Sequence, residues 1–204
     1  MTAPAAIPVA DGVRGLIFDC DGTLADTMPY HLEGWRHAFA GTGVTVPEEW
    51  LDSLKGTPEK RVVTLANERF GLALDPAATV AAKHRVYGRL LEGVRPIEPV
   101  VAVVRAYQGL LPMAIASGGT REHVNIILER LGLTEAFGVV LTADDDDIEH
   151  KPSPQIFLEA ARRMGVEPAA CQVFEDGDIG LDAARRAGML ATDVRPYILK
   201  ERPR

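Results

Sequence analysis

Short runs of apolar residues, each ending in polar residues, recur along this chain and limit the folds open to it. The runs occupy residues 16–18, 113–116, 139–141 and 173–174. An unbroken apolar run of this length is typical of a strand buried on both faces of a parallel sheet. Amphipathic helical patterns separate the runs, so we predict an α/β fold with a doubly wound parallel sheet, in which ligands bind beyond the carboxyl ends of the strands.

The helical patterns also divide the chain. Apolar residues at helical spacing occupy 124–131, 156–164 and 179–187, each followed by a glycine that can end a helix: Gly132, Gly165 and Gly188. Between the first and second strands, helical patterns dominate and no buried-strand run occurs. We therefore predict a discontinuous core of residues 12–27 and 94–204, an inserted helical cap at 28–93, and a loose tail rich in Ala and Pro at 1–11.

The composition excludes several classes of protein. With 204 residues, 47% hydrophobic and 25% charged, the chain is an ordinary globular one. Its net charge of −7 is the wrong sign for binding nucleic acid or an anionic membrane. No run approaches the ~18 apolar residues of a membrane-spanning helix, and the N-terminus lacks a signal-peptide pattern. Two cysteines are too few for a disulfide framework and fit a reducing compartment. Together these features predict a cytoplasmic protein with no nucleic-acid or membrane partner, and its acidic surface and compact size allow a monomer.

The segment DCDGTLADT at residues 19–27 directly follows the first predicted strand. Asp19 and Asp21 stand two residues apart at the strand end, so their carboxylates point to the same side. Two anions this close favour a shared divalent cation or a shifted pKa on one of them. An oxygen-rich site beside a phosphate is a site for Mg²⁺. Two solvated turn aspartates are the alternative, since such turns are common.

Three further polar motifs follow predicted strands or precede a helix. Ser117 ends the second strand and is followed by Gly118-Gly119, Lys151 opens Lys-Pro-Ser-Pro before a helix, and Glu175-Asp176 ends the fourth strand. Taken singly, Ser117 could cap a helix, Lys151 could be a surface lysine and the acidic pair could be a turn. Their joint placement at strand ends favours a functional site instead.

A run of four aspartates at residues 144–147 lies between the third strand and Lys151. A bare charge run of this kind favours a solvated loop over a second metal site. Asp144 is the one member that we consider as a positioning residue for Lys151.

Together the four motifs resemble, in order and context, those of the haloacid dehalogenase superfamily of phosphotransferases, over residues 13–194. The resemblance implies that Asp19 is the nucleophile that forms an aspartyl phosphate and that Asp21 is the general acid and then the base. It also implies that Lys151, the Ser117 hydroxyl and the backbone N–H groups near Gly118 and Gly119 neutralise the phosphoryl group.

The same resemblance implies a Mg²⁺ cofactor. The implied metal site consists of Asp19, Asp21, Glu175 and Asp176, with Asp176 the more direct ligand of the last pair. The dehalogenases that give the superfamily its name lack the second acid because their leaving group is a halide. The presence of Asp21 therefore predicts a phosphoric monoester hydrolase that acts on a small phosphorylated metabolite.

The predicted cap resembles that of the subfamily that contains β-phosphoglucomutases and sugar phosphatases. The substrate-binding residues that this implies are His31, Trp35, Lys55, Gly56, Thr57, Arg61 and Lys83. His31 and Trp35 lie one helical turn apart and so share a face. A partly buried histidine with satisfied hydrogen bonds is the alternative for His31, and ordinary exposed lysines are the alternative for Lys55 and Lys83.

Glu59 departs from the mutase pattern. At this position, two residues after Thr57, β-phosphoglucomutases carry an arginine that grips the distal phosphate, whereas a carboxylate would repel it. The string Gly56-Thr57-Pro58 with Arg61 is more similar to bacterial fructose-1-phosphate phosphatases. We therefore predict a Mg²⁺-dependent phosphatase of small sugar phosphates. The alternatives are an isomerase that interconverts β-glucose 1-phosphate and glucose 6-phosphate, and a non-catalytic ligand-binding protein.

Overall fold

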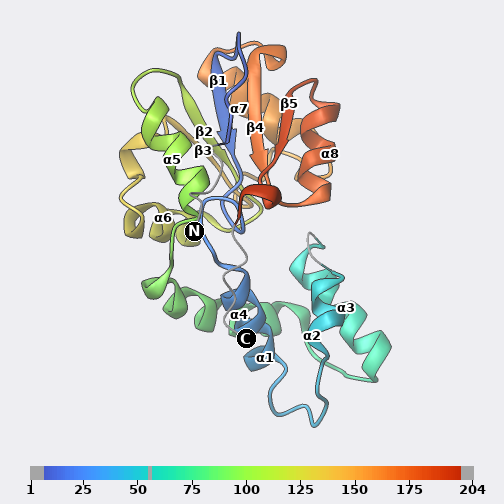
Figure 1. Cartoon of the computed structure of the whole chain (residues 1–204). Coiled ribbons are helices and arrows are strands. Elements are labelled where there is room, and N and C mark those ends of the chain that lie inside the picture. Colours follow the sequence, from blue (N-terminus) through green and yellow to red (C-terminus); the bar gives the residue numbers. More distant parts are fainter. Residues whose placement is uncertain (1–6, 55–56, 199–204) are drawn as a thin grey trace. The chain divides into compact units, whose positions relative to one another are not determined.

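The computed structural model describes residues 7–54 and 57–198. The chain divides into two compact units, one made of Met1–Asp26 with Arg95–Arg204 and the other of Thr27–Val94. We call them the α/β unit and the helical unit; the chain is shown in Figure 1. The predicted α/β fold is confirmed, since a parallel sheet with flanking helices forms the first of these units.

The part of the chain that the structure describes contains one sheet of five strands in the order β3-β2-β1-β4-β5, and every neighbouring pair is parallel. The strands are β1 (Gly15–Phe18), β2 (Met113–Ala116), β3 (Val139–Leu141), β4 (Cys171–Glu175) and β5 (Leu190–Asp193). The central strand β1 is buried along its whole length, as its apolar run predicts. Phe18 at its end stacks on Phe174 of β4, with ring centroids 4.7 Å apart.

The strand β5 has no counterpart among the sequence predictions. It lies at the edge of the sheet, and Leu190 at its start is 45% exposed. Its sequence, Leu-Ala-Thr-Asp, is polar over its second half and lacks the continuous apolar run of the inner strands. The strand β3 at the opposite edge differs, because it carries such a run over Val139–Leu141.

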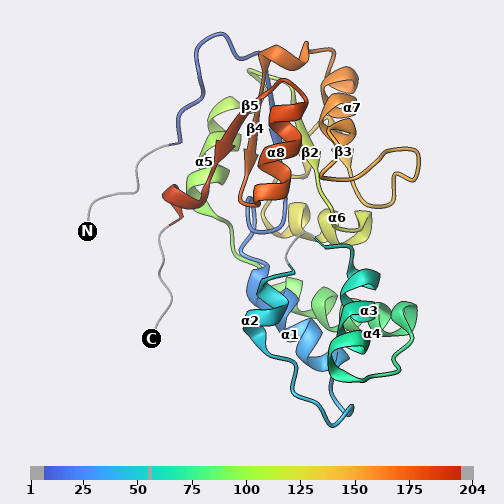
Figure 2. The same ribbon diagram turned by 90° about the vertical axis from the view of Figure 1, so that its right-hand side faces the viewer.

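In the described part of the α/β unit, four α-helices accompany the sheet: α5 (Glu98–Tyr107), α6 (Arg121–Arg130), α7 (Gln155–Met164) and α8 (Asp178–Arg186). The helices α7 and α8 bury Phe157 and Ala183 against Ile17 and Val173 on one face of the sheet. Helix α5 lies on the opposite face, which Figure 2 shows. This three-layer arrangement leaves the carboxyl ends of the strands as the edge where loops and side chains can gather.

The described residues of the helical unit form four α-helices: α1 (Met28–Ala38), α2 (Glu48–Asp52), α3 (Glu59–Phe70) and α4 (Pro76–Leu90). Its core contains Trp35, Phe39, Val63 and Ala66. Helices α1 and α4 approach closely at Gly34, where a Cβ atom would lie 3.1 Å from Cγ of Lys83. The close approach brings side chains of both helices into one cluster, described below.

Short 3₁₀ turns complete the described structure, at Leu91–Gly93, Thr134–Ala136, Pro168–Ala170 and Arg195–Tyr197. Within the described ranges, no helix has both the length and the apolar character that crossing a membrane would require.

Candidate active site

Three charged side chains from separate segments meet at the carboxyl edge of the sheet. Asp19 directly follows β1, and its N–H donates to the carbonyl oxygen of Phe174 at 3.1 Å. The pairing of β1 with β4 therefore brings Asp19 beside Glu175, the last residue of β4. The Nζ atom of Lys151 lies 2.7 Å from Oδ1 of Asp19 and 2.6 Å from Oε1 of Glu175. The predicted functional residues of three motifs thus lie in contact.

Burial controls the electrostatics of this group. It raises the pKa of the Asp19 carboxyl well above its ordinary value, and the Lys151 ammonium only partly opposes this shift. Burial would lower the pKa of Lys151, but the carboxylates of Asp19 and Glu175 outweigh it and raise that pKa. Lys151 is therefore a permanent cation, and its charge is shared between two carboxylates.

Three carboxylates at this contact form a cluster suited to a metal ion. Asp19, Glu175 and Asp176 each offer an oxygen, and the three oxygens lie within 4.8 Å of one another. Asp21, the fourth predicted ligand, is not in this group of described residues. A cluster of carboxylate oxygens without nitrogen or sulfur suits a hard cation such as Mg²⁺ or Ca²⁺. The donor set therefore fits a divalent cation, and Asp19, Glu175 and Asp176 would hold it.

The side chain of Asp176 is closely surrounded by the turn that follows Asp21. Burial, with a smaller contribution from the Glu175 carboxylate, raises the pKa of Asp176 to about 6. The hydroxyl of Thr23 donates to Oδ1 of Asp176 at 3.2 Å. Gly22 has a φ of 78°, and a Cβ atom at this position would lie 2.3 Å from Oδ2 of Asp176. The turn after Asp21 thus requires glycine both for its backbone conformation and for the space that Asp176 fills.

The loop after β2 carries the second motif. Ser117 is buried, and its Oγ accepts a hydrogen bond from the Gly119 N–H at 3.0 Å. Thr120, not Ser117, caps helix α6 by accepting from the His123 N–H. A Cβ atom at Gly119 would lie 3.1 Å from Oδ2 of Asp21 and 3.3 Å from Ser117 Oγ. The Asp21 and Ser117 side chains therefore share the space beside Gly119.

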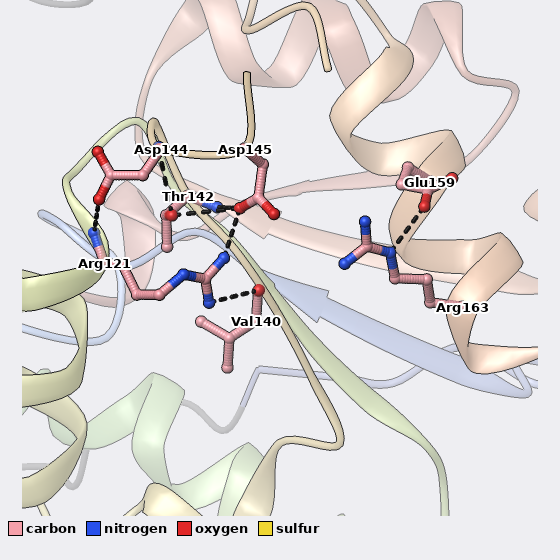
Figure 3. A network of polar contacts seen from close by, with 7 residues as sticks. All are labelled: Arg121, Val140, Thr142, Asp144, Asp145, Glu159 and Arg163. Carbon is pink, nitrogen blue, oxygen red and sulfur yellow. Dashed lines mark hydrogen bonds and ion pairs between the residues drawn. The ribbon is translucent and has the colours of Figure 1, made fainter. Parts of the chain in front are cut away.

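A polar network holds this loop beside the loop after β3 (Figure 3). The Asp144 carboxylate accepts from the backbone N–H of Arg121 at 2.8 Å. Asp145 accepts from the Arg121 guanidinium at 2.6 Å and from the Thr142 N–H at 2.8 Å. The Arg121 guanidinium also donates to the carbonyl oxygen of Val140 at 3.1 Å. Two of the four aspartates predicted as a solvated loop are thus bound by helix α6 and its neighbours.

The helical unit brings together three of the residues predicted for substrate binding. The Nζ atom of Lys83 lies 2.7 Å from Nδ1 of His31 and 5.6 Å from the ring centroid of Trp35. Lys83 is only 1% exposed, so it is not the ordinary surface lysine of the alternative interpretation. It also donates to Glu59, whose other oxygen lies 2.5 Å from Nε2 of His84.

The other predicted residues of this unit lie elsewhere. Arg61 is half-exposed on α3, and its guanidinium lies 3.2 Å from the Glu68 carboxylate. Thr57 precedes α3, and its N–H donates to the carbonyl oxygen of Leu54 at 2.9 Å. Lys55 and Gly56 lie outside the described residues.

Two positions outside the predicted site residues also shape these clusters. A Cβ atom at Gly180 would lie 1.8 Å from Oε1 of Glu175, so the first turn of α8 must lack a side chain there. The sequence signals for this position are its place after Glu175-Asp176 and a glycine inside a helical pattern, which often has a packing reason. The second position is His84, and no spacing along the sequence connects it with Glu59.

Comparisons with known proteins show which family the chain resembles. Residues 13–188 match the family model of the haloacid dehalogenase-like hydrolases. The chain is 42% identical to the fructose-1-phosphate phosphatase YqaB of Escherichia coli, over 89% of this chain and 96% of that protein. It is 28% identical to the β-phosphoglucomutase of Bacillus subtilis, over 89% of this chain and 83% of that protein.

A solved structure shows the same likeness. The crystal structure of CbbY from Rhodobacter sphaeroides in complex with phosphate matches with a TM-score of 0.75 and 25% identity, covering 93% of this chain and 90% of that one. The predicted enzyme class, a hydrolase of phosphoric monoesters, is confirmed by these relationships. The strand ends, the buried charge cluster and the match over most of the sequence lead to one conclusion: this chain belongs to the haloacid dehalogenase-like hydrolase family.

Proposed function

We propose that this protein is a Mg²⁺-dependent phosphatase that hydrolyses small sugar phosphates of the fructose 1-phosphate type through an aspartyl phosphate on Asp19. The observation that carries the proposal is the buried contact of Asp19 with Lys151 at the carboxyl edge of the sheet, beside the carboxylates of Glu175 and Asp176. The relationship to the fructose-1-phosphate phosphatase YqaB supports the choice of substrate class. The cytoplasmic location and the monomeric state stay predictions.

In the first step, a carboxylate oxygen of Asp19 forms a bond to phosphorus and the bond from phosphorus to the ester oxygen breaks. Asp21 gives its proton to the departing alcohol oxygen. In the second step, Asp21 takes a proton from water as the water oxygen bonds to phosphorus. The bond from phosphorus to Asp19 then breaks, which releases inorganic phosphate and restores both carboxyl groups.

Charge neutralisation is the main task of the remaining residues, because phosphoryl transfer concentrates negative charge. Lys151 supplies a fixed cation, and its burial keeps that charge unscreened. The Ser117 hydroxyl accepts from the Gly119 N–H, so its own proton remains available to a phosphoryl oxygen. When bound by Asp19, Glu175 and Asp176, a divalent cation would add further positive charge beside the phosphoryl oxygens. Asp21 stays a predicted member of this metal site.

For the sugar, we propose contacts from the helical unit. His31, Trp35, Thr57, Arg61 and Lys83, with Lys55 and Gly56, are the residues in question. The contact of Lys83 with His31 and its proximity to the Trp35 ring support the idea that these three act together. The half-exposed Arg61, paired with Glu68, has no such support from the structure.

The alternative is a β-phosphoglucomutase-type isomerase, which the similarity to the Bacillus subtilis enzyme favours. The two functions differ in their product. A phosphatase releases inorganic phosphate, whereas the isomerase converts β-glucose 1-phosphate into glucose 6-phosphate without net loss of phosphate.

The test is a phosphate-release screen over a panel of sugar phosphates, with Mg²⁺ and with a chelator. We expect release from fructose 1-phosphate that requires the metal. Asp21→Asn should nearly abolish release from sugar phosphates while circular dichroism shows an intact fold. With p-nitrophenyl phosphate, whose leaving group needs no acid, this variant should give one equivalent of nitrophenolate and then stop. Mass spectrometry should locate one phosphoryl group on Asp19. Near-normal turnover by Asp21→Asn would refute the assigned roles.

A further inference from the structure

Glu59 uses both of its carboxylate oxygens within the helical unit. It is the first residue of α3, and both of its partners lie on α4. One oxygen accepts from the Lys83 ammonium, and the other lies 2.5 Å from Nε2 of His84. Burial would raise the pKa of Glu59, but His84 and Lys83 together lower it to about 2. Glu59 is therefore ionised at every pH at which the protein would work.

The Lys83 ammonium is enclosed by groups that balance its positive charge or accept its hydrogen bonds. Its Nζ atom lies 4.8 Å from the ring centroid of Tyr87 and 2.7 Å from Nδ1 of His31. Because an ammonium only donates hydrogen bonds, Nδ1 of His31 is the acceptor and the ring N–H of that histidine is on Nε2. The Glu59 carboxylate offsets the positive charge of Lys83, so the cluster has no spare cation.

We propose that Glu59 is a specificity-determining residue that excludes substrates carrying a second phosphate or carboxylate distant from the scissile phosphate. This inference rests on the proposed function, in which Lys83 and His31 contact the sugar. A second anionic group would need the positive charge that Glu59 already balances. It would also meet the Glu59 carboxylate, whose side chain is 32% exposed. Sugar hydroxyls carry no charge and meet no such penalty.

At position 59 the chain lacks the arginine of the mutase pattern, and it also carries a negative charge there. A neutral residue at position 59 would leave the Lys83 charge unbalanced and able to attract an anion. Glu59 removes that attraction, so its negative charge itself produces the preference for monophosphates.

The experiment compares wild type with Glu59→Gln, a substitution that keeps the shape and removes the charge. The kcat/KM values are measured for fructose 1-phosphate, fructose 1,6-bisphosphate and p-nitrophenyl phosphate. We expect the ratio of bisphosphate to monophosphate activity to rise about tenfold in Glu59→Gln. Glu33→Gln, which removes an exposed carboxylate paired with Arg36 in the same unit, is the matched control and should leave the ratio unchanged.

The double variant Glu59→Gln/Lys83→Met should return the ratio towards the wild-type value, because both charges are then absent. An unchanged ratio in a folded Glu59→Gln protein would overturn the inference. If Glu59→Gln does not fold, the kcat/KM values of wild type decide. A higher kcat/KM for the bisphosphate overturns the inference, and a kcat/KM about tenfold higher for the monophosphate supports it. Phosphate release from the sugar monophosphates separates the two proposals, since its absence in wild type would refute the proposed function itself.

Discussion

The Nζ atom of Lys151 and Oδ1 of Asp19 lie 2.7 Å apart, although 132 positions separate the two residues in the sequence. The contact is buried, and a second carboxylate, that of Glu175, shares the ammonium at 2.6 Å. One cation therefore holds two carboxylates that would otherwise repel each other in a region with little water.

Replacing Lys151 with Met should destabilise the protein at neutral pH. Without the ammonium, two buried carboxylates remain uncompensated, and loss of one partner of a buried pair costs about 3–5 kcal/mol. The free energy of unfolding is measured by urea titration without divalent cations and again with Mg²⁺. Because a bound cation would balance the same carboxylates, Mg²⁺ should stabilise Lys151→Met more than wild type.

Lys60→Met is the control for this experiment, since Lys60 is exposed on α3. Its stability should lie within ~0.5 kcal/mol of wild type, as for most surface substitutions. Equal stability of Lys151→Met and wild type in the absence of metal would contradict the interpretation of the buried ion pair.

Gly180→Ala should disturb the acidic end of the site. The added Cβ atom would lie 1.8 Å from Oε1 of Glu175, the oxygen that holds Lys151, so the carboxylate must move. We expect a loss of ~1–3 kcal/mol in unfolding free energy, typical of overpacking. Isothermal titration calorimetry should show weaker Mg²⁺ binding.

Gly138→Ala provides the comparison for this substitution, because a Cβ atom there meets nothing within 4 Å. It should bind Mg²⁺ as wild type does. If the two alanine variants behave alike, the close contact at Gly180 does not control the position of Glu175.

The pairing of Glu59 predicts a pH-dependent contribution to stability. Its pKa is about 2 in the folded protein, below the ordinary value of 4.5, because His84 and Lys83 outweigh burial. The folded state therefore favours the ionised form, and the resulting stability is fully present above pH 4.5 and lost as the pH falls towards 2. Since Glu59 is about one-third exposed, we expect a contribution of ~1–2 kcal/mol.

Urea titrations of wild type and Glu59→Gln at several pH values between 7 and 2 would measure this contribution. The difference between the two proteins should be largest near neutral pH and should shrink in the acid range. A difference that stays constant across the range would show that the carboxylate charge does not stabilise the helical unit.

Asp145→Asn should loosen the loops beside the site. Asp145 Oδ2 accepts from the Arg121 guanidinium, the Thr142 N–H and the Thr142 hydroxyl, so loss of its charge weakens several bonds together. Charge-assisted hydrogen bonds of this kind contribute ~1.5–3 kcal/mol. We expect a lower unfolding free energy and a raised KM for the substrate, because the Gly119 carbonyl oxygen accepts from the N–H of Ala143 in the same loop pair.

Asp146→Asn removes the neighbouring charge from an exposed side chain and serves as the matched control. Its stability and KM should both stay at the wild-type values. A similar effect from both variants would mean that the overall charge of the aspartate run matters, and not the network around Arg121.

The inner part of the fold could be predicted because burial on both faces leaves a plain pattern in the sequence. Residues 16–18 and 113–116 are continuous apolar runs, and both form strands. Parallel strands end at one edge, so the approach of Asp19 to Glu175 follows from topology. The edge strand β5 escapes this reasoning because Thr192 and Asp193 make half of it polar.

The charge cluster of the helical unit could not be predicted in the same way. The sequence identifies Lys83 as a candidate and Glu59 as a departure from the mutase pattern, yet only the packing of α3 and α4 shows that they are partners. Contacts between helices depend on crossing angle and rotation, which no local spacing encodes. Gly180 shows a similar limit, because its importance comes from a neighbouring carboxylate.

The strand order has a consequence for how the enzyme is made. The central strand β1 is synthesised first, but its two neighbours, β2 and β4, both follow residue 94 in the sequence. As the chain leaves the ribosome, the backbone of β1 lacks its partner strands until the whole helical unit has been synthesised. Translation that stops before Cys171 would yield a truncated polypeptide without β4, Glu175 or Asp176. Such a fragment could neither bury β1 nor gather the acidic side chains, so catalytic competence arises only near the end of translation.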